Sequence, residues 1–174
     1  MRIFLAAVAV SASALISGGC SASSAQSIRA DVAAVRSLYE AFAWEAVLAE
    51  SGPEQPLPLL PRPALLKYLT PELSELFLQD RQCVARTQGI CNLDFTPLWD
   101  SQDPSGATVT MTGESNLGEV LVQVRYPDQV RKLHFRLAHG AAGWKIADIV
   151  YEGRDTLSLT RLLATPVVGD SAVK

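Results

Sequence analysis

The sequence predicts an α+β fold in which helices from the first half of the chain cover one face of an antiparallel sheet from the second half. Apolar residues recur at helical spacing up to about residue 87, and from residue 107 onward they alternate with polar ones. A short helix is expected near the end of the chain, at about 156–163. The 174 residues suit one compact unit in which helices are layered on a sheet.

The predicted helices are separated by proline. An amphipathic helix is expected over 27–50, followed by the loop GPEQPLPLLPRP, which can form neither regular helix nor central strand. A short helix is expected over 64–69. A second long helix is expected to begin after Thr70, an N-cap residue before Pro71, and to continue to about Thr87.

Four strands are predicted from the alternation of apolar and polar residues in GATVTMTG, EVLVQVRY, VRKLHFRLAH and WKIADIVY. The register follows from keeping every apolar row on one face of the sheet. This criterion pairs Val109 with Val122, Val122 with Phe135, and Leu137 with Ile146. A four-stranded antiparallel meander with one apolar face is the result.

The first 19 residues have the features of a bacterial signal peptide. Arg2 precedes an apolar run over 3–16, and small residues lead to Cys20. We therefore expect cleavage before Cys20, attachment of lipid to its thiol, and a linker over 20–27. The alternative is cleavage after Ala25, which would release a soluble periplasmic chain.

A single domain is predicted over 28–163, with a flexible tail over 164–174. The expected location is the periplasmic side of the cell envelope, with the outer membrane favoured for the lipid-anchored form. The formal net charge of −3 argues against a nucleic-acid partner. No phosphate-binding loop or other cofactor motif is present, so no cofactor is predicted.

Two cysteines remain after removal of Cys20. Cys83 and Cys91 lie in CVARTQGIC, and in an oxidising compartment such a pair predicts a structural disulfide. Two free thiols, or a redox or metal-binding pair, are the alternatives. A metal site is disfavoured because no third cysteine is present and His134 and His139 lie on a distant predicted strand.

The motifs LTPEL, LWDSQD, GWKIADIVYEG and SLTRLL resemble those of the YbjP-like envelope lipoproteins, a bacterial family of unknown function within the nuclear-transport-factor-two-like, or cystatin-like, superfamily. The likeness spans Val32 to Leu163 and implies a cone-like fold, with the N-terminal helices packed on a curved four-stranded antiparallel meander and a short C-terminal helix. It departs from the family pattern where Pro104, rather than an aromatic residue, follows Asp103.

Folds of this superfamily resemble isomerases and hydratases that hold an aspartate in the cone beside a tyrosine or a second acid. Alternation along the last predicted strand places Asp148 on the apolar side, where burial would raise the pKa of a general acid or base. The candidate catalytic residues are therefore Asp148, Tyr126 and Tyr151. The alternatives for Asp148 are a place at the rim of the cone, the capping of a turn, or pairing with an arginine such as Arg29 or Arg36.

Three further residues are candidates for ligand binding, namely Asp103, Trp99 and Trp144. Asp103 either lines the mouth of the cone or caps a turn. The leading functional hypothesis is a non-catalytic binding or structural module that holds an envelope protein or a small apolar ligand. The alternatives are an isomerase or hydratase using Asp148, and an inhibitor or immunity-type protein against an envelope hydrolase.

Overall fold

The computed structural model describes residues 29–47, 55–153 and 157–166 of the chain. The predicted signal peptide, the lipidation site at Cys20 and the linker lie outside these residues. In the described part of the chain, no helix is long and apolar enough to cross a membrane.

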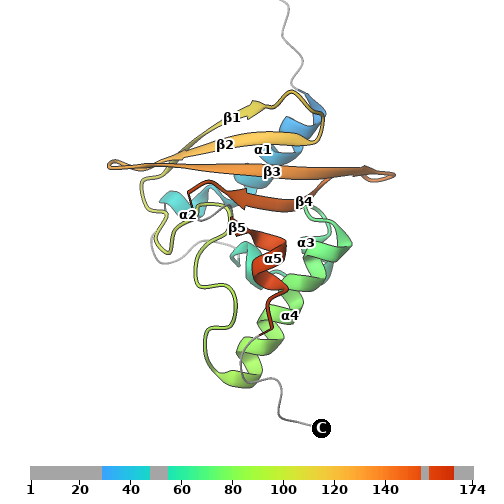
Figure 1. Ribbon diagram of the computed structural model, residues 1–174, viewed down its shortest axis with the longest axis vertical. Helices are drawn as coiled ribbons and strands as arrows, with labels where there is room; N and C mark the ends of the chain where they lie inside the picture. Colours follow the sequence, from blue (N-terminus) through green and yellow to red (C-terminus); the bar gives the residue numbers. More distant parts are fainter. Residues whose placement is uncertain (1–28, 48–54, 154–156, 167–174) are drawn as a thin grey trace, which may run out of the picture.

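An antiparallel sheet with the strand order β1-β2-β3-β4-β5 forms the upper half of the molecule (Figure 1). Its strands are β1 (Thr108–Gly113), β2 (Glu119–Arg125), β3 (Val130–Gly140), β4 (Gly143–Tyr151) and β5 (Leu157–Ser158). The predicted α+β fold is confirmed. A short fifth strand extends the four-stranded meander.

The observed register agrees with the prediction for one hairpin and differs by two residues for the other two. Leu137 pairs with Ile146 as expected. Val122, however, pairs with Met111 on one side and Leu133 on the other. A slip of two residues leaves every side chain on its original face, so alternation alone cannot detect it.

Six helices accompany the sheet in the described part of the chain. They are α1 (Ala30–Phe42), α2 (Trp44–Val47), the 3-10 turn η1 (Leu57–Leu59), α3 (Arg62–Leu65), α4 (Pro71–Thr87) and α5 (Leu159–Leu163). The first predicted helix is therefore interrupted after Phe42. The proline-rich loop contains η1, and α3 begins two residues earlier than expected.

The start and end of α4 follow from local chemistry. The Thr70 hydroxyl accepts a hydrogen bond from the Leu73 N–H at 3.3 Å, which is the predicted N-cap. At the other end, Gln88 adopts the left-handed conformation with φ of 54° and its N–H bonds the Val84 carbonyl. The helix therefore ends at Thr87, as predicted, with Gln88 as its C-cap.

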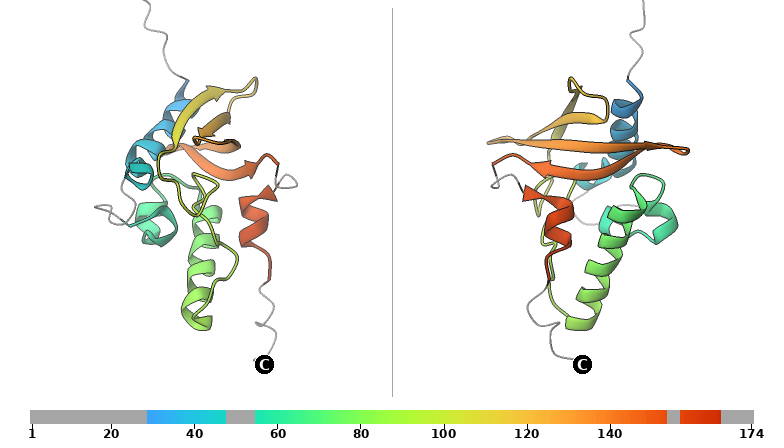
Figure 2. Two further views of the ribbon diagram at one scale, coloured as in Figure 1. Left: turned by 90° about the vertical axis from the view of Figure 1, so that its left-hand side faces the viewer. Right: turned by 45° about the vertical axis from the view of Figure 1, so that its right-hand side comes forward.

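Helix α1 covers the inner face of the curved sheet, and α4 and α5 extend away from it (Figure 2). Val35 and Leu38 on α1 are fully buried with Val122, Leu133 and Phe135 on the strands, so they form the centre of the core. This packing buries the apolar face of the sheet that alternation predicts.

The extension of α4 and α5 is cross-linked at its far end. Cys83 on α4 and Cys91 in the following loop form the predicted disulfide, with their Cα atoms 6.2 Å apart. The loop then returns toward the sheet, which brings the LWDSQD segment beneath the strands.

Candidate functional site

The inner side of the sheet is occupied by the chain's own segment Pro97–Trp99. Three tyrosines on different elements donate their hydroxyl protons to its successive carbonyl oxygens. Tyr151 donates to Pro97 at 3.1 Å, Tyr39 to Leu98, and Tyr126 to Trp99 at 2.7 Å. The segment is therefore fixed in place by three side chains from the core.

Aromatic packing closes the space around this segment. Trp99 is 2% exposed and meets the Tyr39 ring edge-on at 5.4 Å between ring centres. Phe95 packs in the same way against Tyr151, at 5.3 Å. The side chains of this segment thus fill the space beneath the inner face of the sheet.

The ionisable groups of this interior have altered pKa values because they are buried. Desolvation raises the pKa of Tyr39 well above its ordinary value, and that of Tyr126 is also raised by burial. Burial likewise raises the pKa of Glu45, whose Oε2 accepts a hydrogen bond from the indole N–H of Trp99 at 2.6 Å. The tyrosines consequently remain protonated donors over the physiological pH range.

Three of the predicted site residues, Trp99, Tyr126 and Tyr151, therefore belong to this filled interior. Tyr151 is fully buried and Tyr126 partly so, and each hydroxyl already donates to a backbone carbonyl. In these positions they anchor the Pro97–Trp99 segment.

The predicted interior placement of Asp148 is wrong. The pairing of β3 with β4 shifts between Arg136 and Leu137, so that Asp148 lies opposite Arg136 and Ile149 lies opposite the buried Phe135. The extra residue in β4 moves Asp148 to the other face of the sheet. The prediction assumed that side chains alternate between the two faces along the whole of β4, so it could not detect the bulge or the change of face at Asp148.

Asp148 instead binds the start of α5. Its carboxylate accepts hydrogen bonds from the Ser158 hydroxyl at 2.7 Å and from the Thr160 N–H at 3.0 Å. The nearest guanidinium nitrogen of Arg136 lies 4.0 Å away. Asp148 therefore caps the start of α5, in agreement with the alternative interpretation, and the arginine beside it is Arg136 rather than Arg29 or Arg36.

Asp103 and Trp144 occupy two further environments. Asp103 is exposed and accepts the Ser105 N–H at 2.9 Å, so it caps a turn. Trp144 is partly exposed near the tip of the β3–β4 hairpin and packs against the His139 ring at 4.9 Å. Asp103 and Trp144 therefore lie in two different places, and neither joins Trp99, Tyr126 and Tyr151 in the filled interior.

An apolar hollow of about 390 Å³, here called the hairpin groove, lies between the β3–β4 hairpin and the start of α4. Backbone bonds from Thr70 N to the Ile146 carbonyl and from Ile146 N to the Tyr68 carbonyl, both 2.9 Å, hold its two walls together. Its lining consists of Leu66, Leu69, Thr70, Pro71, Glu72, Ala138, His139, Gly140, Ala141, Ala142, Gly143 and Lys145.

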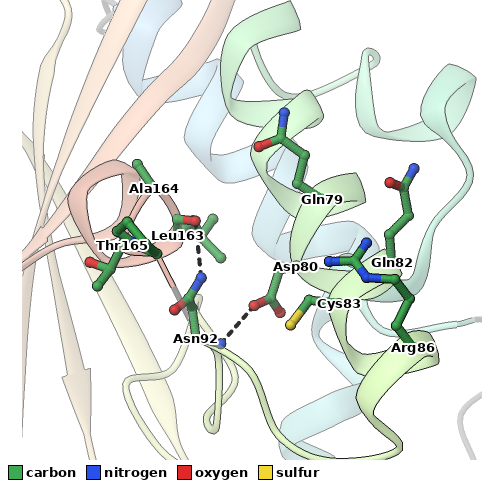
Figure 3. A pocket seen from close by; sticks show the side chains of 10 residues that line it. Gln79, Asp80, Gln82, Cys83, Arg86, Asn92, Leu163, Ala164 and Thr165 are labelled. Carbon is green, nitrogen blue, oxygen red and sulfur yellow. Dashed lines mark hydrogen bonds between the residues drawn. The ribbon is translucent and has the colours of Figure 1, made fainter. Parts of the chain in front are cut away.

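A polar hollow of about 350 Å³, here called the helix pocket, lies between α4 and α5 (Figure 3). Its lining consists of Gln79, Asp80, Gln82, Cys83, Arg86, Asn92, Leu163, Ala164, Thr165 and Pro166. Within the described ranges, no group of three or more His, Cys, Asp or Glu side chains is placed to hold a metal ion.

Sequence reasoning missed both hollows. Polar residues at helical spacing on α4, from Gln79 through Gln82 to Arg86, were an available signal for the helix pocket. The hairpin groove had a weaker signal, the run of small residues in AHGAAG. Neither signal identifies a cavity until the facing element is known.

Comparisons with known proteins give little guidance. No family model matches the chain, and no curated protein matches it. A phospholipid-binding protein from Ralstonia solanacearum, solved in complex with a phospholipid, aligns at 20% identity with a TM-score of 0.33. The alignment covers 54% of this chain and 49% of that one, about half the length of each. A likeness this weak carries no argument, so the resemblance to YbjP-like lipoproteins stays a prediction.

Proposed function

We propose that this protein is a non-catalytic binding module that takes the apolar part of a small ligand into the hairpin groove. One observation carries the proposal. The interior that would hold a substrate is filled by Pro97–Trp99, whereas the hairpin groove is an open, mainly apolar hollow at the surface.

The groove has the size and lining of a small-molecule site. Its volume of about 390 Å³ falls within the range of about 300–1,000 Å³ that such sites occupy. Leu66 and the alanines of the hairpin supply apolar contact. The lining also holds one cation, Lys145, whose ammonium donates one hydrogen bond to the Lys67 carbonyl, and one anion, Glu72. An apolar chain with a polar head group suits this arrangement.

A ladder of straight-chain fatty acids tests the proposal. Decanoate, octanoate and hexanoate are titrated into ¹⁵N-labelled protein, and the backbone amide signals of Ala138, Ala141 and Ala142 are followed. Each methylene that enters the groove contributes about 0.8 kcal/mol. We therefore expect the dissociation constant to rise about fourfold for each carbon removed, with saturable shifts at the hairpin.

Two variants localise the binding. Ala138→Glu places a charge on the groove wall at an exposed strand position and should weaken decanoate binding by at least about tenfold. Thr112→Glu, at an exposed position on β1, is the matched control and should leave binding unchanged. Equal affinity for the three acids, or equal weakening by both variants, would disprove the groove as the site.

We further propose that the module is held at the cell envelope by lipid on Cys20. The support is the sequence alone, with its short apolar run and small residues before the cysteine. The intact mass of protein purified from membranes tests this. A chain beginning at Cys20 and carrying lipid is expected, whereas a chain beginning at Gln26 would establish the soluble periplasmic form.

A further inference from the structure

The helix pocket contains a buried carboxylate with one oxygen left for a ligand. Asp80 is 7% exposed, and its Oδ1 accepts the Asn92 N–H at 2.8 Å (Figure 3). In the part of the chain that the structure describes, its Oδ2 accepts no hydrogen bond and forms no ion pair, and Asp80 lines the helix pocket. A buried carboxylate oxygen requires hydrogen-bond donors, so a ligand that supplies them is favoured.

The wall opposite Asp80 is held in a fixed position. The Asn92 side-chain amide donates to the Leu163 carbonyl at 3.1 Å, so this one residue links α4 to the end of α5 (Figure 3). The disulfide of Cys83 to Cys91 adds a covalent link beside it. The pocket therefore exists before any ligand arrives, which lowers the entropic cost of binding.

The remaining lining defines the chemistry of the ligand. The carboxamides of Gln79 and Gln82 are exposed, and each offers both donors and an acceptor. The lining carries one acidic and one basic side chain, Asp80 and Arg86, so it has no excess of either charge to select an ionic ligand. Hydroxyl groups both donate and accept, and amide groups pair reciprocally with carboxamides, so the lining matches a molecule that carries both.

We propose that the helix pocket binds a neutral saccharide bearing acetamido groups. Its hydroxyl groups donate to Asp80 Oδ2, and its acetamido groups pair with the carboxamides of Gln79 and Gln82. Ala164 and Pro166, which are exposed, supply apolar surface for the sugar's C–H faces. The site is separate from the hairpin groove, because no residue lines both hollows.

The test is a titration of ¹⁵N-labelled protein with N,N′-diacetylchitobiose, followed through the side-chain amide signals of Gln79, Gln82 and Asn92. Saturable shifts at these signals are expected. Maltose, a disaccharide without acetamido groups, should bind at least about tenfold more weakly, because the carboxamides then lose their partners. Absent or non-saturating shifts would overturn the site, and equal binding of maltose would overturn the assignment of acetamido groups.

Asp80→Asn is the decisive variant. Asparagine keeps Oδ1 as acceptor for the Asn92 N–H but replaces Oδ2 by an amino group, so the fold is retained and the ligand's acceptor is lost. We expect binding to weaken by at least about tenfold, since hydrogen bonds to charged groups are strong. Asp94→Asn removes the same charge at an exposed position outside the pocket and should leave affinity unchanged.

A second variant covers any loss of folding in Asp80→Asn. Gln82→Ala removes only an exposed side chain, and it should weaken binding roughly two- to tenfold while thermal unfolding stays the same. If affinity is unchanged in both Asp80→Asn and Gln82→Ala, the pocket does not bind the sugar as proposed.

Discussion

The filled interior beneath the sheet and the extension formed by α4 and α5 are stabilised in different ways. In the interior, the Pro97–Trp99 segment is buried, its carbonyls accept hydrogen bonds from tyrosines, and Trp99 meets the Tyr39 ring edge-on. The extension buries Phe77 and Leu163 in the core, but it also depends on a disulfide and on Asn92, and it leaves Val84 and Ile90 exposed.

This difference separates stability from binding. A closely packed core leaves no room for a ligand, and any change in it is costly. The hollows lie where elements meet through only a few polar or covalent links, as in the helix pocket and the hairpin groove. The apolar residues therefore form the closely packed core, and the two hollows lie at junctions between elements near the surface.

The largest effect is expected from Leu98→Ala in the filled interior. Leu98 is 1% exposed, so truncation leaves a cavity and should lower the free energy of unfolding by about 2–5 kcal/mol. Urea unfolding measures this change. Leu117→Ala, at a residue 72% exposed, is the control and should alter stability by less than about 0.5 kcal/mol. A comparably small loss at Leu98 would mean that the interior is not closely packed.

A smaller effect is expected from removing the disulfide, in the variant Cys83→Ser with Cys91→Ser. The bond closes a short loop, and chain-entropy arithmetic gives a loss of about 2.5 kcal/mol. Hydrogen exchange locates the loss. Protection should fall in the last turns of α4 and persist in β2 and β3, whereas a uniform decrease across the sheet would contradict the independence of the two regions.

The junction between sheet and extension provides the next prediction. Thr70→Ala removes the N-cap of α4 and should cost about 1 kcal/mol, measured by thermal unfolding. Thr70→Ser retains a capping hydroxyl and should recover most of the loss. If the serine variant is as unstable as the alanine variant, the hydroxyl is not the source of the effect.

The smallest effect is a pH dependence at Glu45. Burial raises its pKa in the folded state above the unfolded value near 4.5, so its contribution is fully present below that value and is lost as pH rises through the folded pKa. Glu45→Gln cannot ionise. Its stability relative to the native protein should therefore improve as pH increases from 4 to 7, by less than the capping effect.

Urea midpoints at several pH values measure this trend. Glu40→Gln, an exposed position on α1, is the matched control and should show a smaller trend. A Glu45→Gln difference that is constant with pH would show that the carboxyl group titrates alike in the folded and unfolded chains.

The sequence determined those elements whose physics is local. Thr70 and Pro71 specified the start of α4, alternation specified four strands and the faces of the first three, and the spacing of Cys83 and Cys91 specified a disulfide. Caps, alternation and short loops depend on neighbours a few residues away, so they can be interpreted without knowing the fold.

Only the tertiary structure decided three features: the register of the sheet, the face of the sheet on which Asp148 lies, and the position of the LWDSQD segment. A slip of two residues preserves every face, a single bulge in β4 reverses the face of Asp148, and the tyrosines that hold Pro97–Trp99 lie on three separate elements. The physical reason is the same in each case. These features depend on contacts between segments far apart in the chain, and such contacts are set by the packing of the whole molecule rather than by any local pattern.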